Sequence, residues 1–535
     1  MLSAARLTAL LPLVLCIQTA FAAPSNARRS IALEDGNASS SSSSSLVTSR
    51  SYAPSASTTS RSASLPSATL AKRATACTTT AQCPKVANAK VGCNTKSKLC
   101  VTTCNAGYTL SGTLCTANAA QPAAVTTAAA VKTTTTVAPV PTTTTPPAPV
   151  CAPTYAGAAT TIRGTGTLPK PTAFVKRSGT SLTVSGRGYR IAGPNIYWLC
   201  SDENVNGGAP PDKGRVREAL AIAVAMGANT VRLHTCGVSV GPNNPYNLNP
   251  SYNNWVAGLW DARDYALYAA REYGLRVIMP LTDNYDFYHG GKYSFLNFVG
   301  ASIANKGSQF YTNQNAINAY SSYITTFLTH VNAYTGVSYA NDPTILAWET
   351  GNELGAWQHS EMWPPAAWTT AIANVIRKSD RNHLIIDGTD GFWDPNTGAT
   401  PDGLRVSTVD IMSDHGYPRS TSILSKELSL AKSAGKAMFV GEWDWTSSHG
   451  GSALSDYINM LESGGIGDMM WSLFGHDAQC CAFVQHNDGY SLYYPNGNSA
   501  ADQANALKVV QHYYRVTGRA VPSKLPAVAC PQPAF

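Results

Sequence analysis

The sequence predicts an α/β fold, a (β/α)8 TIM barrel over residues 151–535, preceded by a small disulfide-rich module and disordered linkers. Three observations predict this fold. Short β-branched runs alternate with longer segments whose apolar residues recur every three to four positions. Eight such strands follow one another, in a stretch whose size suits a closed barrel better than an open sheet. No linker-like segment interrupts residues 151–535, so we expect one large domain there.

Residues 1–22 have the features of a secretory signal peptide. Arg6 precedes an apolar stretch, and Ala20 and Ala22 form the small-x-small pair that signal peptidase prefers. The apolar run is too short to span a bilayer, and no later segment reaches about 18 apolar residues. We therefore expect a secreted, extracellular protein that has no membrane association after cleavage.

Three further segments are expected before the barrel. Residues 23–73 contain a serine run and no apolar period, which predicts a disordered segment that can serve as a pro-region. It ends at Lys72-Arg73, which is either a processing site like those of fungal secretory proproteins or an ordinary exposed pair. Residues 74–115 hold six cysteines but too few residues for an apolar core, so three bridges are expected to stabilise a small module. Residues 116–150 are rich in Ala, Thr and Pro and are expected to form an extended linker.

Twelve of the 13 cysteines follow the signal peptide, an even number that suits disulfides in an oxidising compartment. The six-cysteine module is expected either to bind wall polysaccharide or to act as a spacer or protein contact. Zinc is not expected there, because no histidine accompanies the thiols. In the barrel, Cys151 and Cys530 are expected to bridge the two ends of the domain, and adjacent Cys480 and Cys481 should have different partners.

The charge distribution argues against a nucleic-acid partner. The net charge is +8, but residues 1–150 hold 12 Lys/Arg and 2 Asp/Glu, whereas residues 151–535 hold 27 and 29. The basicity therefore belongs to the N-terminal segments, and the barrel is nearly neutral. Charged residues make up only 13% of the chain, which is typical of a secreted protein. A near-neutral substrate fits this barrel best.

The strands and helices of the barrel alternate along the chain. The strands are short and β-branched, and the helical segments repeat apolar residues so that one face can pack on a sheet. The strands are expected at 191–197, 230–233, 276–280, 345–349, 383–387, 410–413, 437–441 and 468–471. The helices include 215–226, 262–274, 316–331, 365–379, 421–435 and 500–517.

Candidate functional residues stand where strands end, which is where (β/α)8 barrels place their chemistry. Glu353 follows the fourth strand and Glu442 the seventh, so the two carboxyl groups should face each other across the barrel mouth. Glycosidic cleavage needs such a pair: one protonates the leaving oxygen, and the other meets positive charge at the anomeric carbon. A separation of about 5 to 5.5 Å would imply a covalent intermediate and retention. The other strand-end candidates are Arg232, Asn352, His415, Tyr417 and Trp471.

These candidates lie in five ordered segments of sequence. TILAWETGNELG at 344–355, SDHGYP at 413–418 and AMFVGEWDW at 437–445 resemble the fourth-, sixth- and seventh-strand signatures of glycoside hydrolase family 5, whose members are retaining (β/α)8 glycosidases. NTVRLHTCG at 229–237 and GDMMWSLFG at 467–475 are similar to the second- and eighth-strand signatures. The resemblance implies retention, with Glu353 as the acid/base and Glu442 as the nucleophile.

The two carboxyl groups need different protonation states for these roles. Arg232 is expected to lower the pKa of Glu442, and Tyr417 to donate a hydrogen bond to the same carboxylate. The pKa of Glu353 is expected to be raised by a less polar wall that includes Trp348 and by the charge of Glu442.

The remaining candidates are expected to contact the sugar. Asn352 is placed to hydrogen-bond the 2-hydroxyl, and His415 to contact another hydroxyl or to orient Glu353. Trp471 should form an apolar floor under the cleaved sugar. Taken singly, each of these residues could instead be structural, but the ordered set favours the functional interpretation.

Aromatic residues in the loops above the strands suit a cleft for several sugars, and we expect Trp198, Asn284, Tyr285 and Trp443 to bind substrate. The third-strand end, PLTDNYDFYHGG at 280–291, resembles the Asn-Asn-Trp stretch of fungal endo-β-1,4-mannanases, with Tyr285 in place of the Trp. The resemblance favours an endo-β-1,4-mannanase that acts on plant or fungal wall polysaccharide, namely mannan, glucomannan or galactomannan.

Two other functions stay open. One is another family 5 activity, either a β-glucanase or an exo-β-mannosidase, and a long loop closing one end of the cleft would favour exo action. The other is a non-catalytic wall-binding protein. The chain is expected to be a monomer without a cofactor. No metal is expected either, because the histidines show no metal-ligand spacing along the sequence, namely His234, His289, His476 and His486.

Overall fold

The computed structural model describes residues 168–205, 207–355 and 361–535, together with the backbone of four short strands between residues 89 and 117. The expected signal peptide, the Ser-rich segment and the Ala/Thr/Pro linker beyond Ala117 lie outside the described residues. The chain divides into two compact units, Met1–Val140 and Pro141–Phe535. In the first unit, β1 (Ala89–Asn94) pairs antiparallel with β2 (Leu99–Cys104), and β3 (Tyr108–Ser111) pairs antiparallel with β4 (Leu114–Ala117).

The second unit is built on a parallel sheet of eight strands, in the hydrogen-bonded order β8-β15-β14-β13-β12-β11-β10-β9. The backbone N–H of Asn229 donates to the carbonyl of Ala192, and that of Ile196 to the carbonyl of Arg232, so β8 also joins β9 and the barrel closes. The predicted (β/α)8 fold is therefore confirmed. The strands are β8 (Ala192–Pro194), β9 (Thr230–Arg232), β10 (Arg276–Pro280), β11 (Ile345–Glu349), β12 (Leu384–Asp387), β13 (Ile411–Gly416), β14 (Ala437–Trp443) and β15 (Gly467–Met470).

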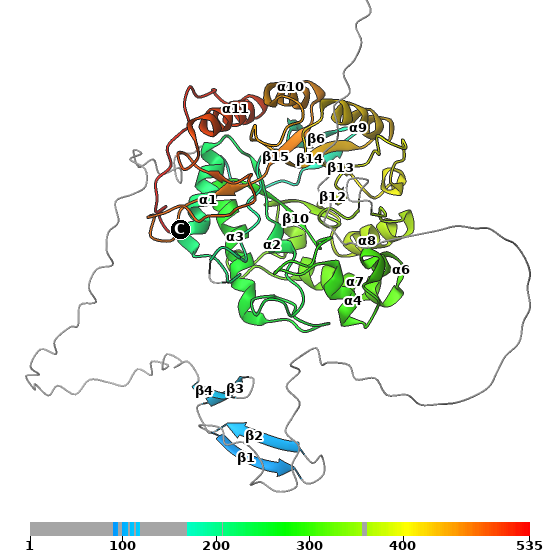
Figure 1. The fold of residues 1–535 in the computed structure, drawn as a ribbon, viewed down its shortest axis with the longest axis vertical. Helices are drawn as coiled ribbons and strands as arrows, with labels where there is room; N and C mark the ends of the chain where they lie inside the picture. The colour runs from blue at the N-terminus through cyan, green and yellow to red at the C-terminus, as the bar shows by residue number, and fades with distance from the viewer. Residues whose placement is uncertain are drawn as a thin grey trace, which may run out of the picture. The chain divides into compact units, whose positions relative to one another are not determined.

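Helices surround these strands (Figure 1). Side chains cap several of them: Asp212 accepts from the backbone N–H of Gly214 at the start of α1, and Asn313 accepts from Asn315 and Ala316 at the start of α7. The six predicted helices are present, and α10 is an additional one. No helix among the described residues is both long and apolar enough to cross a bilayer. The long helices are α1 (Lys213–Ala225), α3 (Trp260–Tyr273), α7 (Gln314–Thr329), α8 (Ala366–Ser379), α9 (Thr421–Ser433), α10 (Leu454–Gly464) and α11 (Ala500–Val516).

Short helices and strands occupy the connections. The helical ones are α2 (His234–Gly237), α4 (Lys292–Phe298), α5 (Ala304–Gly307), α6 (Gln309–Thr312) and the 3-10 turns Ala257–Leu259, Tyr339–Asn341 and Asp402–Arg405. A two-stranded parallel sheet pairs β16 (Leu473–Phe474) with β17 (Leu492–Tyr493).

The interior of the barrel is filled with apolar side chains, and its amino-terminal end is closed. Six successive strands each contribute one fully buried residue to one cluster: Ile278, Leu346, Ile386, Ile411, Phe439 and Met469. An antiparallel sheet of β5 (Lys176–Ser178), β6 (Ser181–Val184) and β7 (Arg187–Tyr189) packs Leu182, Val184 and Tyr189 against this cluster. This small sheet was not predicted from the sequence. With this end filled, the opposite end of the barrel is left for a site.

Disulfides tie two of the connections. Cys200 pairs with Cys236, which joins the segment after β8 to α2. Cys530 pairs with Cys480, so the expected Cys151–Cys530 bridge is wrong. The reason is the course of the C-terminal segment, whose Gln532 carbonyl accepts from Arg217 of α1, close to the 476–481 segment. Cys481 is also disulfide-bonded, so the adjacent cysteines do have different partners, as expected.

Candidate active site

A cavity of about 440 Å³ lies at the carboxyl ends of the barrel strands. Its wall combines aromatic rings with a few titratable side chains, a combination that is typical of ligand-binding pockets. Both Glu353 and Glu442 line it, so the structure brings the two predicted carboxyl groups into one cavity. The lining residues are Tyr197, Glu203, His234, Tyr285, Phe287, Tyr288, His289, Asn352, Glu353, Tyr417, Glu442, Trp471, His486, Asp488 and Tyr490.

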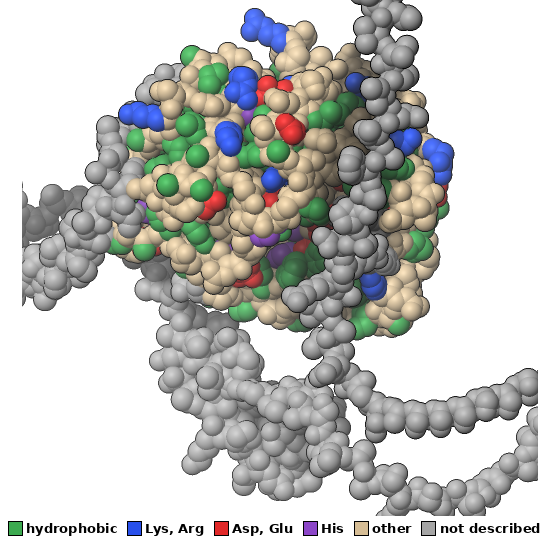
Figure 2. Space-filling view, turned by 45° about the horizontal axis from the view of Figure 1, so that its top comes forward, with side chains coloured by type: hydrophobic (Ala, Val, Ile, Leu, Met, Phe, Trp, Pro, Cys, Tyr) green, Lys and Arg blue, Asp and Glu red, His purple; other side chains and the backbone are tan. Residues whose placement is uncertain are grey.

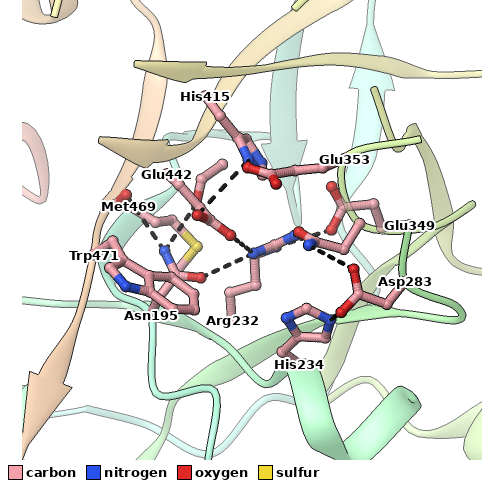
Figure 3. Close-up of polar contacts among 12 residues, drawn as sticks. Asn195, Arg232, His234, Asp283, Glu349, Glu353, His415, Glu442, Met469 and Trp471 are labelled. Atoms are coloured by element: carbon pink, nitrogen blue, oxygen red, sulfur yellow. Dashed lines mark hydrogen bonds and ion pairs between the residues drawn. The ribbon is translucent and has the colours of Figure 1, made fainter. Parts of the chain in front are cut away.

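Arg232, the last residue of β9, is the centre of the buried polar network (Figure 3). Its Nη1 lies 2.7 Å from Oε1 of Glu442, and its Nε lies 2.8 Å from Oε2 of Glu349. Its Nη2 donates to Oδ1 of Asn352 at 2.7 Å. None of the Arg232 side chain is exposed, so these charge-assisted bonds form away from water. One guanidinium therefore fixes two carboxylates, on β11 and β14, and the amide of the residue Asn352 that follows β11.

Glu442 lies near the end of β14 and is almost fully buried. Besides Arg232, the hydroxyl of Tyr417 donates to its Oε2 at 3.3 Å. The predicted contacts of Arg232 and Tyr417 with this carboxylate are therefore both present.

Glu353 occupies the turn after β11, where its backbone has a φ of 53°. A non-glycine residue in this left-handed region is uncommon, and such strain is typical of functional turns. The turn is held from both sides, because the backbone N–H of Asn352 donates to Thr282 and that of Leu354 donates to Gly388. Nδ1 of His415 lies 2.7 Å from Oε1 of Glu353, and the Tyr285 hydroxyl also hydrogen-bonds this carboxyl group.

The carboxyl groups of Glu353 and Glu442 are close neighbours. An oxygen of each, together with a ring nitrogen of His415, forms a group in which the atoms lie within 4.8 Å of one another. Nδ1 of His415 is 2.7 Å from Glu353 and 3.7 Å from Oε2 of Glu442. His415 therefore lies between the two acids, and Figure 3 shows its ring beside both.

The charges of these three groups are coupled. Burial raises the pKa of Glu442 to about 7, although His415 and Arg232 favour its charged form. Burial opposes the charge of His415, but Glu442 and the hydrogen bond with Glu353 raise its pKa to about 9. Burial also raises the pKa of Glu353, but the hydrogen bond and charge of His415 outweigh it and hold that pKa below its ordinary value. We expected the pKa of Glu353 to be the higher of the two. In the free site the pKa of Glu442 is the higher one, because His415 lies closer to Glu353.

Trp471 follows β15 and lines the cavity. Its ring stacks on Tyr197, with centroids 5.2 Å apart and planes 12° apart, and its Nε1 donates to Oδ2 of Asp488 at 2.7 Å. Since its orientation is fixed from two sides, it presents a rigid ring to the cavity, as expected for an apolar floor.

Three of the residues expected to bind substrate lie outside the cavity. Trp198 is buried under the guanidinium of Arg215, whose Cζ is 3.8 Å from the ring centroid, and donates to the carbonyl of Leu473. Trp443 is fully buried and donates to Asp468, because it follows Glu442 in β14 and successive strand residues face opposite sides.

Asn284 lies in the loop after β10, one position after Asp283. It is buried against Lys292 and donates to Glu361, whereas the preceding Asp283 belongs to the polar network of the cavity. Tyr285 does line the cavity, and it does so as a partner of Glu353.

Two acids of the network were not predicted. Glu349 is a fully buried carboxylate at the end of the apolar run of β11, and a lone acid in such a run is a signal for a buried cationic partner. Asp283 accepts from Nδ2 of Asn352 at 3.1 Å, so the Asn352 amide is held at both ends. Asp283 comes three residues after the end of β10, on the same side of the barrel as the other strand-end residues.

Residues 172–419 match the family described as "GH family 5 beta-mannosidase-like". Over these residues the barrel domain is similar to glycoside hydrolase family 5. This family 5 match includes Arg232, Asn352, Glu353 and His415, and Glu442 lies beyond its end. Curated relatives of the domain include mannan endo-1,4-beta-mannosidase 1 of Oryza sativa, which is 30% identical over 287 residues, or 50% of this chain and 63% of the relative. Mannan endo-1,4-beta-mannosidase 1 of Arabidopsis thaliana is 28% identical over 46% of this chain and 59% of the relative. The chain thus spans about six-tenths of the length of these relatives.

Solved structures share the fold of this domain. The endo-1,4-beta-mannanase from Rhizomucor miehei has a TM-score of 0.52 and 21% identity, over 65% of this chain and 100% of that one. The family 5 mannosidase from the same organism, as its E301A mutant, has a TM-score of 0.51 and 18% identity, over 65% and 99%.

Proposed function

We propose that this protein is a secreted, retaining glycosidase that hydrolyses β-1,4-mannosidic bonds in mannan polysaccharides. The observation that carries the proposal is the pair of carboxyl groups, Glu353 and Glu442, with oxygens within 4.8 Å of each other in one cavity. Such a short separation supports a covalent intermediate, because inverting enzymes keep their two carboxyl groups about 6.5 to 9.5 Å apart to admit a water.

Glu442 acts as the nucleophile. Its carboxylate attacks the anomeric carbon as the bond to the leaving oxygen breaks, and a glycosyl ester forms. Arg232 favours the charged form before attack, and Tyr417 keeps one oxygen oriented. Water then attacks the same carbon and releases Glu442, so the product keeps its original configuration.

Glu353 acts as the acid and then as the base. The proton for the leaving oxygen is held in the His415–Glu353 pair, because Nδ1 of protonated His415 lies 2.7 Å from Glu353. Moving this proton to Glu353 before bond cleavage leaves neutral His415. When the ester forms, the negative charge of Glu442 disappears and Glu353 can accept the proton of the attacking water.

The substrate class is supported by three features. The named activity of the plant relatives is mannan hydrolysis. The cavity wall is rich in Tyr, Phe and Trp, whose rings match the C–H faces of sugars. On the face that Figure 2 shows, Lys/Arg and Asp/Glu side chains are dispersed, as suits a neutral polysaccharide. Secretion is supported by the signal-peptide features of residues 1–22.

Exo action is a second candidate, and the loop after β10 favours it. Tyr285, Phe287, Tyr288 and His289 all line the cavity. The Tyr288 hydroxyl donates to the carbonyl of Ser201 at 2.8 Å, so this loop reaches the segment after β8 and forms a fixed wall. A wall beside the catalytic pair would admit the end of a chain more readily than its middle.

Three measurements test these proposals. Reducing-sugar release from mannan, glucomannan, cellulose and laminarin should be greatest on the mannans, and NMR of the first product should show retention. Mannopentaose labelled at its reducing end should give labelled oligosaccharides of several lengths early if the enzyme is endo-acting. If it is exo-acting, the first products should be unlabelled mannose and labelled mannotetraose. Release that persists in both Glu353→Ala and Glu442→Ala would exclude this site as its source.

A further inference from the structure

Two histidines of the cavity wall and the buried Asp283 converge on one point without belonging to the carboxyl pair. Nε2 of His289 lies 2.8 Å from Oδ2 of Asp283, and Nε2 of His234 lies 3.3 Å from the same oxygen. The three side chains are at least 95% buried, and both histidines line the cavity. His234 comes from α2, after β9, whereas Asp283 and His289 come from the loop after β10.

These separations match the distances between neighbouring ligand atoms around a bound metal ion. Transition metals bind imidazole nitrogen and carboxylate oxygen at about 2.1 Å, which sets neighbouring ligand atoms about 3.0 Å apart at right angles and about 3.4 Å apart at the tetrahedral angle. The two measured distances, 2.8 and 3.3 Å, lie close to this range. All three ligand atoms also lie within 4.8 Å of one another.

The two histidines share a single oxygen of Asp283. Nε2 of His234 is buried, and its 3.3 Å contact with this oxygen is longer than the 2.8 Å contact of His289. A buried imidazole nitrogen with a weak partner is costly, and a metal ion bound by all three groups would satisfy it.

The surroundings hold the three ligands in place. Nδ2 of Asn352 donates to Oδ1 of Asp283, which orients the carboxylate from outside the cluster. The backbone N–H of Lys292 donates to the carbonyl of Asp283, and that of Val240 donates to the carbonyl of His289. The Cys200–Cys236 disulfide fixes α2, which carries His234.

We propose that His234, Asp283 and His289 form a binding site for a divalent first-row transition metal such as Zn²⁺. Two imidazoles and one carboxylate favour such ions over Ca²⁺ and Mg²⁺, which prefer oxygen ligands. Three protein ligands leave coordination positions for water or a sugar hydroxyl on the cavity side. The ion would tie α2 to the loop after β10. This site does not depend on the proposed hydrolytic activity.

Zinc binding to the full, tag-free chain tests the proposal. After equilibrium dialysis against Zn²⁺, the wild-type protein should carry one equivalent more than either His234→Gln or His289→Gln. A matched control is His330→Gln, because Nε2 of His330 lies 2.9 Å from Oδ1 of Asp264 in a single His–Asp pair. This control should keep the wild-type zinc content. Equal zinc content in all four proteins would overturn the proposal.

A second measurement uses the wild-type chain alone. Saturating Zn²⁺ should raise its thermal midpoint by mass action, and Co²⁺ should give the visible absorption band of an imidazole-ligated ion. The absence of both the shift and the band would overturn the proposal even if the variants fail to fold.

Discussion

Nη1 of Arg232 lies 2.7 Å from Oε1 of Glu442. The same guanidinium also bonds Glu349 and Asn352, so its three nitrogens are used in three directions. A lysine keeps the charge but cannot reproduce this planar arrangement.

Arg232→Lys should therefore lower kcat/KM by about 10²–10³-fold, the cost of losing one preorganised electrostatic partner. Steady-state kinetics on a mannooligosaccharide measure this loss. Arg263→Lys is the matched control, since Arg263 is equally buried but bonds Ser239 and Leu259, outside the cavity. It should change kcat/KM by less than about threefold. An unchanged kcat/KM in Arg232→Lys would show that the guanidinium has no role in turnover.

Azide rescue should distinguish the roles of the two glutamates, Glu353 and Glu442. Glu353→Ala should lose about 10²–10⁴-fold on mannan but less on an aryl mannoside whose leaving group needs no proton. Azide should then attack the glycosyl ester and give the β-mannosyl azide. With Glu442→Ala, azide should replace the nucleophile itself and give the α-mannosyl azide. Proton NMR distinguishes the two products. If Glu353→Ala gave the α-mannosyl azide and Glu442→Ala the β-mannosyl azide, the two residues would have the opposite roles.

A matched control for this pair is Glu272→Ala. Glu272 lies on α3 and pairs with Lys170, away from the cavity. The substitution should leave turnover unchanged and should give no mannosyl azide.

The pH dependence of kcat/KM should follow Glu442 and His415. Burial raises the pKa of Glu442 to about 7, so activity should fall as the pH drops through this value and the nucleophile takes up a proton. The neighbouring acids raise the pKa of His415 to about 9, so activity should fall again as the pH rises through that value and the stored proton is lost. In His415→Asn the fall in kcat/KM at high pH should disappear or shift to another pH. If this fall stays at the same pH, it belongs to the titration of another group.

Trp471 should contribute to binding through its ring. Trp471→Ala removes the face that stacks on Tyr197 and should lower kcat/KM about tenfold, mostly through KM. Trp471→Phe keeps a ring and should recover most of this loss. Trp260→Phe is the control, because Trp260 stacks on His330 outside the cavity and should not affect KM. An equal loss in Trp471→Phe would point instead to the bond with Asp488.

Phe439→Ala should be among the costly substitutions for stability. Phe439 is fully buried in the barrel interior, and truncating such a residue costs about 3–5 kcal/mol. Val521→Ala, at a site that is 47% exposed, should cost less than about 0.5 kcal/mol. Denaturant unfolding of the two variants measures the difference. A small loss of stability in Phe439→Ala would mean that the interior side chains can move to fill the space left by the ring.

The parts of the fold predicted from the sequence are those with a strong repeating pattern. The eight barrel strands appear within a few residues of their expected bounds, because buried parallel strands read as short β-branched runs. The sheet β5–β7 was missed, since strands of three or four residues carry too few apolar positions to show an alternation.

The site shows a different limit. Arg232, Asn352, Glu353, His415, Tyr417 and Glu442 meet in one network or cavity, as the strand ends predicted. Trp443 follows Glu442 within β14, and in a strand one residue reverses the direction of a side chain. Asn284 lies in the loop after β10, where the sequence shows no alternation that could tell it from Asp283. The contact of His415 with both acids, and hence the order of the pKa values, needs distances that no sequence pattern provides.

The sheet β5–β7 fills the base of the barrel, at the end opposite Glu353 and Glu442. Substitutions that are far apart and share no contacts add their effects on folding free energy. Stabilising changes in β5–β7 should therefore combine independently with changes in the loops that select substrate. The barrel can thus gain heat resistance at its base while its rim is redesigned for other sugars.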